Sequence, residues 1–350
     1  MTPLISVIID TYNHERFIED AIRSVLDQDF PRSQMEILVV DDGSTDRTPE
    51  IVRKFEPQVR LLRKQNGGQA SSINYGVAKS RGEFVAFLDG DDVWLPNKLS
   101  RVVAEFRSHP EAVMVYHKFS FRDPRDGREW EPGWIGVSGD IVADPRKLHA
   151  YGAAPTSSLA FRRQALERII PIPDALVFMA DAFLIATVIF LGPVVAVPES
   201  LAKNCVHGHN LWFVEAHKPD PNVLRRRVEM REAAIKGLRD WTDKNAPGPA
   251  LRQVRYFLRR WRLIQDNDEF QFEAPGRLKE FVHLCRQPLV DQPAYSRIWL
   301  AYSWLHAFAF LIFGKHAHYL EGVRTRVSNL KRRLQGRIVA DQSGETAGHG

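Results

Sequence analysis

The sequence predicts an α/β fold in which a mostly parallel sheet is flanked by helices and followed by a C-terminal α-helical extension. Over residues 4–100, short apolar runs that suit buried strands alternate with segments of helical spacing. This alternation is typical of parallel strands joined by crossover helices. From about residue 217 the strand-like runs stop, and helical, basic patterns take over.

Strands are expected where apolar residues run together, and helices where apolar side chains recur every three or four positions. Ser44 or Thr45 is expected to cap the second helix. Residues 120–145, rich in glycine and proline, are expected to form an irregular segment or a hairpin. The expected strands are residues 4–9, 36–40, 59–62, 84–88, 112–116 and 194–198. The expected helices are residues 15–28, 99–106, 182–191, 222–243, 251–265, 276–286 and 296–337, with segments around 51–55 and 73–78.

The stretch at residues 84–92, FVAFLDGDD, joins a buried strand to three carboxylates in four positions. Buried acids need a neutralising partner, because taking a carboxylate out of water costs free energy. A divalent cation, Mg²⁺ or Mn²⁺, is such a partner, since carboxylate oxygens are ligands that both ions accept. The alternative is an acidic turn in which Asp92 caps a helix that begins near Pro96.

Acids also follow two of the other expected strands. Asp10 follows the first strand, and Asp41 and Asp42 follow the second. The carboxyl ends of parallel strands share one edge of a sheet, where α/β proteins of this kind bind their ligands. No Gly-x-Gly-x-x-Gly turn follows the first strand, which disfavours a dinucleotide site of the usual kind.

Four motifs in this order resemble the family 2 glycosyltransferases, whose catalytic domain has the GT-A fold. The resemblance implies an inverting enzyme that moves a sugar from a nucleotide-diphosphate sugar with the help of a divalent metal, Mg²⁺ or Mn²⁺. Asp10 departs from the family pattern, which usually has proline there. The motifs are residues 6–13 (SVIIDTYN), 39–46 (VVDDGSTD), 66–68 (NGG) and 88–92 (LDGDD).

The resemblance also implies roles for single residues. One acid of the Asp41–Asp42 pair would bond the base of the nucleotide, and Asp89 would lie nearer the ribose. For residues 66–68 a plain turn before a helix stays open, and for residues 206–210 a surface turn does. The residues expected to bind the donor are Thr11, Tyr12, Asn13, Asp41, Asp42, Asn66, Gly67 and Asp89, and those expected at the metal are Asp91, Asp89 and His209.

Asp181 is the residue expected to act as the general base. In the family an acid pair, most often Glu-Asp, occupies this place, and its Asp deprotonates the acceptor hydroxyl. Here Ala180 precedes Asp181, so a single acid remains. The alternative role for Asp181 is an N-terminal cap of the helix at 182–191.

The two parts of the chain differ in charge. Residues 1–216 carry 24 Lys and Arg against 29 Asp and Glu, a net charge of −5, whereas residues 217–350 carry 24 against 14, a net charge of +10. The acidic part suits a metal site and the basic part an anionic partner, although solvated charge on helix faces is the alternative. The expected domains are residues 1–216, catalytic; 217–338, helical and basic; and 339–350, a disordered tail.

The C-terminal region is expected to meet an anionic membrane surface. Its segment at 251–265 interleaves arginines with aromatic residues, which favours a membrane-surface helix over nucleic acid, since no nucleic-acid-binding motif accompanies it. The uncharged run at 298–314 is short for a span, so an in-plane, re-entrant or buried helix is expected. A lipid-linked saccharide or a polysaccharide is the expected acceptor.

Other features bear on location. Cys205 and Cys285 lie far apart in no metal-binding spacing, which indicates a reducing compartment, and the first residues lack the pattern of a signal peptide. The expected location is the cytoplasm, at the inner face of the membrane.

Two further functions stay open. A nucleotidyl or phosphoryl transferase would also hold a metal on acids at strand ends, but neither an Asp-x-Asp-x-Thr motif nor a Walker loop occurs. A sugar-nucleotide-binding scaffold without catalysis has one supporting feature, Ala180 in place of an acid.

Overall fold

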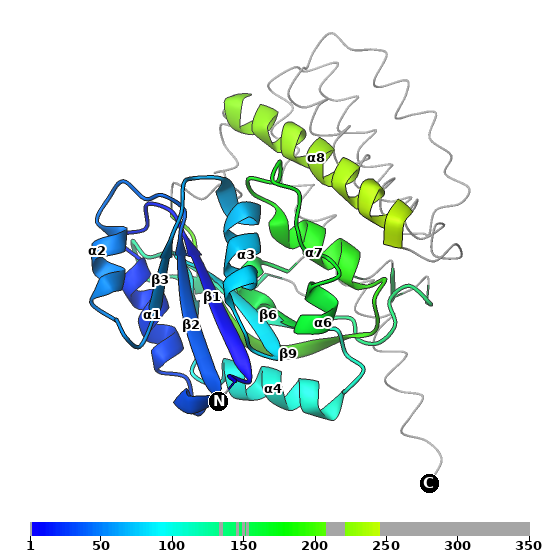
Figure 1. Cartoon of the computed structure of the whole chain (residues 1–350), viewed down its shortest axis with the longest axis horizontal. Coiled ribbons are helices and arrows are strands. Elements are labelled where there is room, and N and C mark those ends of the chain that lie inside the picture. The colour runs from blue at the N-terminus through cyan, green and yellow to red at the C-terminus, as the bar shows by residue number, and fades with distance from the viewer. Residues whose placement is uncertain are drawn as a thin grey trace. The chain divides into compact units, whose positions relative to one another are not determined.

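The computed structural model of this 350-residue chain describes residues 2–132, 136–144, 147–148, 151, 154–207 and 221–245 (Figure 1). The chain divides into two units, one of residues 1–215 and 232–255 and the other of residues 216–231 and 256–350. The fold described here is that of the first unit. The expected helices at 251–265, 276–286 and 296–337, with the apolar run at 298–314, lie outside the described residues.

A mixed sheet lies at the centre of this unit. Its strands are β1 (Ile5–Thr11), β2 (Met35–Asp41), β3 (Arg60–Arg63), β4 (Phe84–Asp89), β5 (Val93–Trp94), β6 (Met114–Arg122), β7 (Glu129–Trp130), β8 (Leu159–Arg162) and β9 (Val194–Cys205). They lie in the order β3-β2-β1-β4-β8-β6-β9-β5, and β7 pairs with β6. Strands β1 to β4 run parallel, whereas β8 is antiparallel to both of its neighbours.

Helices pack on both faces of the parallel strands (Figure 1). Alternate residues of β1, Ile5, Val7 and Ile9, share one buried cluster with apolar residues of α1 and α4. On the other face, a Cβ on Gly76 of α3 would come within 2.6 Å of Ile8. The helices are α1 (Ile18–Leu26), α2 (Thr48–Arg53), α3 (Gly68–Lys79), α4 (Lys98–Ser108), α6 (Arg163–Leu166), α7 (Ala180–Val188) and α8 (Pro221–Asn245).

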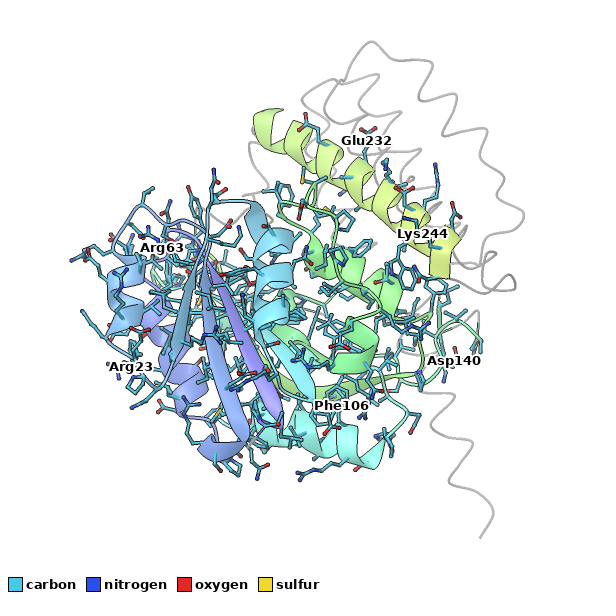
Figure 2. The ribbon with its side chains drawn as sticks, viewed as in Figure 1. Arg23, Arg63, Phe106, Asp140, Glu232 and Lys244 are labelled. Carbon is cyan, nitrogen blue, oxygen red and sulfur yellow. The ribbon has the colours of Figure 1, made fainter. Side chains whose placement is uncertain are left out.

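The core contains aromatic contacts that hold helices against strands. Phe106 of α4 stacks on Phe84 of β4 with ring centroids 4.4 Å apart (Figure 2). Near the end of α8, the indole N–H of Trp241 donates a hydrogen bond of 3.0 Å to the carbonyl of Arg168. The predicted α/β class, with helices flanking a sheet, is therefore confirmed.

The main differences from the expected elements concern strands that pair with distant partners. Strand β9 runs to Cys205 rather than ending near Pro198, because shifts in its register with β6 around Lys118 accommodate the proline. The two-residue strand β5 pairs with β9 and has no apolar run that could have indicated it. In the segment at 120–145, β6 and β7 form a hairpin pairing, as predicted.

The expected helix caps are wrong. Helix α4 begins at Lys98 after Asn97, so Asp92 does not cap it. Helix α2 begins at Thr48, whose N–H donates to Asp46 Oδ1 at 2.9 Å, and neither Ser44 nor Thr45 caps it. Asp181 lies inside the first turn of α7, after Met179 at the capping position. Among the described helices, none is long and apolar enough to cross a membrane.

Candidate active site

Acids from three parallel strands meet where the carboxyl ends of these strands lie side by side. In the register of the sheet, Asp10 of β1 pairs with Asp89 of β4, and Thr11 pairs with Asp41 of β2. This placement follows from the parallel arrangement, which brings the carboxyl ends of the three strands together. The acids expected at this edge therefore lie where the sequence predicted them.

Asp10 and Asp89 form a pair of neighbouring carboxyl groups. Burial is the main cause that raises the pKa of Asp10 to about 7; the charges of Asp91 and Asp42 also act upward, and a hydrogen bond with Asp89 acts downward. Burial, followed by the charge of Asp10, raises the pKa of Asp89 well above its usual range. Each of the two neighbouring carboxyl groups therefore disfavours ionisation of the other.

Asp91 contacts an imidazole that lies far away in the sequence. Its Oδ2 lies 2.9 Å from Nε2 of His207, just after β9, and the His207 ring stacks on Phe17 with centroids 4.6 Å apart. Burial alone would raise the pKa of Asp91, but the hydrogen bond to His207 and the nearby His14 outweigh it and lower the pKa. Asp91 is therefore held as a carboxylate beside a nitrogen donor.

Gly90 allows the turn between the two acids to approach strand β1 closely. A Cβ at this position would lie 2.7 Å from Thr11 Oγ1 and 2.9 Å from Nδ1 of His14. Thr11 Oγ1 and His14 Nδ1 are themselves 3.2 Å apart. A side chain at Gly90 would push the acids away from β1.

The two acids after β2 hold loops of the expected nucleotide site. Asp42 accepts hydrogen bonds from the N–H groups of Gly67 at 3.0 Å and Gly68 at 2.7 Å, and it pairs with Lys64. These contacts fix the Asn-Gly-Gly segment against the sheet edge. The segment is thus both the turn before α3 and a part of the site's rim.

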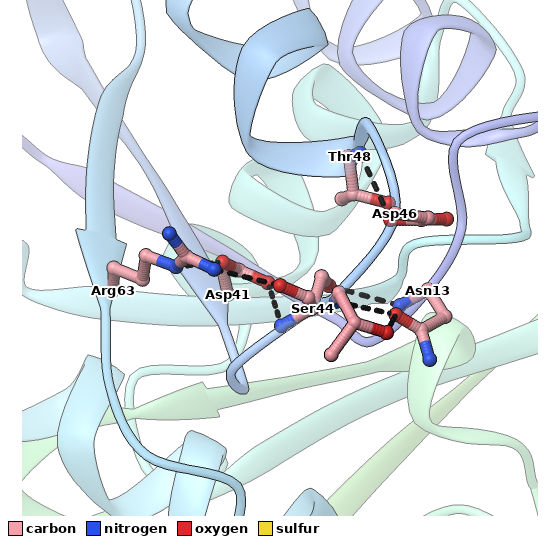
Figure 3. A network of polar contacts seen from close by, with 7 residues as sticks. Asn13, Asp41, Ser44, Asp46, Thr48 and Arg63 are labelled. Atoms are coloured by element: carbon pink, nitrogen blue, oxygen red, sulfur yellow. Dashed lines mark hydrogen bonds and ion pairs between the residues drawn. The ribbon is translucent and has the colours of Figure 1, made fainter.

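Asp41 holds a second loop (Figure 3). Its Oδ1 accepts from the N–H of Ser44 at 3.0 Å, and its Oδ2 lies 3.0 Å from Nε of Arg63. Asn13, in the left-handed region at φ 55°, accepts a hydrogen bond of 2.8 Å from the N–H of Thr45. The side chain of Asp41 is fully buried and that of Arg63 is half-exposed, so the predicted contact of Asp41 with the base of the nucleotide stays a prediction.

Gln69 is a residue of the site that the sequence analysis missed. Its Nε2 donates to Asp89 Oδ1 at 3.2 Å and to Thr156 Oγ1 at 3.0 Å, while its Oε1 accepts from the N–H of Ala180 at 3.2 Å. The side-chain amide of Gln69 therefore joins Asp89, at the carboxyl end of β4, to the start of α7. Its position directly after residues 66–68 was the available signal.

Asp181 lies half-buried in the first turn of α7. Burial is the main cause that raises the pKa of its carboxyl to about 6, against the lowering effect of hydrogen bonding to the N–H of Ala182. The charge of Asp181 is also the last of the causes that raise the pKa of Asp89. A carboxyl with this pKa is ionised at neutral pH yet basic enough to accept a proton.

Asp91 and His207 suit a transition metal such as Mn²⁺. They place a carboxylate oxygen and an imidazole nitrogen side by side, a mixed donor set that Mn²⁺ accepts more readily than Mg²⁺ does. In the part of the chain that the structure describes, no cluster of three or more such side chains forms a complete metal site. His209, the histidine expected at the metal, lies outside that part.

Residues 6–170 match the family described as Glycosyl transferase family 2. An uncharacterised glycosyltransferase of Nostoc sp. is 38% identical over 214 residues, which are 59% of this chain and 66% of the Nostoc protein. The structure of Staphylococcus aureus TarS 1–349 in complex with UDP-GlcNAc matches with a TM-score of 0.54 and 20% identity, over 97% of this chain and 92% of that chain. The mannosyltransferase PcManGT from Pyrobaculum calidifontis, in complex with GDP-Man and Mn²⁺, matches with a TM-score of 0.50 and 21% identity, over 90% and 88% of the two chains.

The fold and the acids at its sheet edge define a protein of the GT-A class. Residues 6–170, which contain all four motifs, match the glycosyl transferase family 2 model, so the predicted resemblance of these motifs to that family is confirmed. It spans 66% of the Nostoc relative and 60% of an uncharacterised relative from Mycobacterium tuberculosis.

Proposed function

We propose that this protein transfers a sugar from a nucleotide-diphosphate sugar to a hydroxyl group of an acceptor, with inversion at the anomeric carbon. The observation that carries the proposal is the Gln69 bridge. It holds the donor-side acid Asp89 and the helix start that bears Asp181 through contacts of 3.2 Å each. A base and a donor site that face each other in this way suit a single displacement.

The donor class is supported by the rim of the site and by the similar structures. Asp41 holds the loop at Ser44 and Thr45, which in turn bonds Asn13, and Asp42 holds Gly67. We place Asn13 and Gly67 beside the nucleotide together with Thr11, Tyr12 and Asn66. TarS was solved with UDP-GlcNAc and PcManGT with GDP-Man. A nucleotide-diphosphate sugar is the donor that both complexes have in common.

We place a divalent metal, Mn²⁺ before Mg²⁺, at Asp91 and His207. When bound, the ion supplies positive charge to the diphosphate leaving group. The adjacent Asp89 carboxyl, tied to Asp10 and Gln69, orients the donor from the other side of Gly90. His209 remains a predicted further ligand.

In the proposed reaction, Asp181 moves the proton. Its carboxylate accepts the proton of the acceptor hydroxyl as that oxygen forms a bond to the anomeric carbon. The bond from this carbon to the diphosphate breaks at the same time, and its electron pair leaves with the diphosphate. Because bond formation and departure occur on opposite faces, the configuration inverts.

For the acceptor we propose a lipid-linked saccharide or a surface polysaccharide. The support is the net charge of +10 over residues 217–350, which suits an anionic membrane surface. Flotation of the full chain with anionic and with neutral vesicles tests this part. Equal recovery with both would contradict a membrane role for the basic region.

The first experiment on the reaction is a thermal-shift screen of UDP, GDP and their sugar conjugates, with and without Mn²⁺, on the full chain. One nucleotide is expected to raise Tm only when Mn²⁺ is present, because a ligand that binds the folded state stabilises it. Transfer from the matching sugar nucleotide then separates an enzyme from a scaffold. Stabilisation without turnover of any acceptor or water would favour the scaffold.

A further inference from the structure

A buried polar network adjoins Asp91 and His207 in the chain. Its centre is Asp92, which is only 3% exposed. Asp92 accepts hydrogen bonds from Ser157 Oγ at 2.6 Å, Asn204 Nδ2 at 2.7 Å and the N–H of Cys205 at 2.8 Å. Burial, followed by the charge of Asp91, raises the pKa of Asp92 well above its usual range, and the three donors together fix the orientation of its carboxyl group.

Ser157 extends this network to the other acid of the motif. Its Oγ accepts a hydrogen bond of 3.0 Å from the N–H of Asp89 while it donates to Asp92. Asp91 lies between Asp89 and Asp92 in the sequence, and His207 lies two residues after Cys205. The network therefore fixes both segments that bring Asp91 and His207 together.

Lys98 adds a further hydrogen bond to this network. It is fully buried, its Nζ donates to the carbonyl of Ser157 at 2.7 Å, and the same Nζ lies 3.5 Å from the centroid of the Trp94 ring. Burial lowers the pKa of Lys98 well below its usual range, and the charges of Asp92 and Asp89 offset only part of that shift. The hydrogen bond holds the backbone of the same serine whose Oγ joins Asp89 to Asp92.

We propose that Asp92 is a positioning residue that sets the placement of His207 against Asp91, with Ser157 as the link and Lys98 as a further donor to the network. The inference rests on the proposed function, which assigns the binding of Mn²⁺ to the contact between Asp91 and His207. A buried carboxyl group held by three donors has one low-energy orientation. The end of β9, and His207 with it, is thereby aligned to within a hydrogen bond of Asp91.

The test uses two adjacent serines in the full chain. Ser157→Ala removes the link between Asp89 and Asp92. Ser158→Ala is the matched control, because Ser158 is equally buried and its Oγ has no hydrogen-bond partner among the described residues. Asp92→Asn is a second variant, since an amide offers one acceptor oxygen to three donors.

Two readouts are measured for each variant. Amide hydrogen exchange in the metal-free protein reports whether the segments around residues 89–92 and 203–207 stay ordered together. Thermal shift with UDP or GDP reports the Mn²⁺ concentration needed for half of the full stabilisation. For Ser157→Ala and Asp92→Asn we expect faster exchange in both segments and an increase of about tenfold in that concentration, as for loss of a hydrogen bond to a charged group. Ser158→Ala is expected to match the wild type in both readouts.

Two results would overturn the proposal. Faster exchange with an unchanged Mn²⁺ response would show that the network only stabilises the fold, and an effect of Ser158→Ala equal to that of Ser157→Ala would show a general response to a lost hydroxyl. Failure of the proposed function would be seen in the wild type itself, because no nucleotide with Mn²⁺ would then raise its Tm. In that event the exchange measurement alone decides whether Asp92 joins the two segments.

Discussion

His207 Nε2 lies 2.9 Å from Asp91 Oδ2, although 116 positions separate the two residues in the chain. The contact is made at the end of β9, whose pairing with β6 and β5 brings residues 194–205 back to the acid edge of the sheet. It places a nitrogen and an oxygen donor beside the expected position of the donor diphosphate. The first prediction tests it.

Replacing His207 by alanine is expected to weaken the response to metal. Loss of one of two described donors should raise the Mn²⁺ concentration for half-maximal stabilisation by UDP or GDP at least about tenfold. His109→Ala is the control, because its imidazole contacts Glu105 on α4, outside the site. An unchanged Mn²⁺ response in His207→Ala would place the metal elsewhere.

Asp181→Asn is expected to lower kcat by a factor of about 10² to 10⁴, the range for loss of a general base. Binding of the donor, measured by thermal shift or calorimetry, should stay within about twofold, because the donor lies on the Asp89 side of Gln69. The exposed Asp174→Asn is the control. If Asp181→Asn turns over at the wild-type rate, another group is the base.

The dependence of kcat on pH should report the pKa of Asp181. Burial raises the pKa of Asp181 to about 6, and only the ionised carboxylate accepts a proton. We therefore expect kcat to rise about tenfold per pH unit below that pKa and to level off above it. A profile that is flat between pH 5 and 7 would contradict the assignment.

Asp10→Asn is expected to stabilise the metal-free protein at high pH. The folded protein holds the Asp10 proton up to a pKa of about 7, whereas the unfolded chain releases it near 3.8. A raised carboxyl pKa means that the wild type loses stability as pH rises between these values, and an amide does not ionise. Tm with EDTA should thus rise more at pH 8 than at pH 5, by about 2–4 °C per kcal/mol gained. The exposed Asp27→Asn should show no such difference between the two pH values.

Gln69→Leu is expected to remove the hydrogen-bonded link between Asp89 and the start of α7, which carries Asp181. Asp89 and the N–H of Ala180 would each lose a partner, and the start of α7 would no longer be tied to the sheet edge. We expect kcat to fall about tenfold with a smaller change in donor KM, since the loss concerns alignment rather than binding. The neighbouring, exposed Gln65→Leu is the control. A change confined to donor KM would instead make Gln69 a donor contact.

Much of the sheet could be predicted from the sequence because its parallel strands are buried runs with local signatures. Strands β1, β2 and β4 are each a run of mostly apolar residues with an acid at or next to its last position, and parallel pairing brings those ends together. Strand β5 was not predicted, and β9 was predicted to end too early. Both are set by pairing with strands far away in the sequence rather than by their own residues. Local pattern carries no information on such pairing.

The sequence by itself determined the α/β class, the order of the motifs and the edge at which Asp10, Asp42 and Asp89 gather, because each depends on residues close in the chain. Only the tertiary structure decided which polar groups contact each other around these acids. It placed Asp92, for which the sequence left a helix cap open as the alternative, at the centre of a buried network, and it joined Gln69 to both Asp89 and Ala180. The physical reason is that buried polar groups must find partners wherever the packed chain supplies donors and acceptors, and those partners lie far away in sequence.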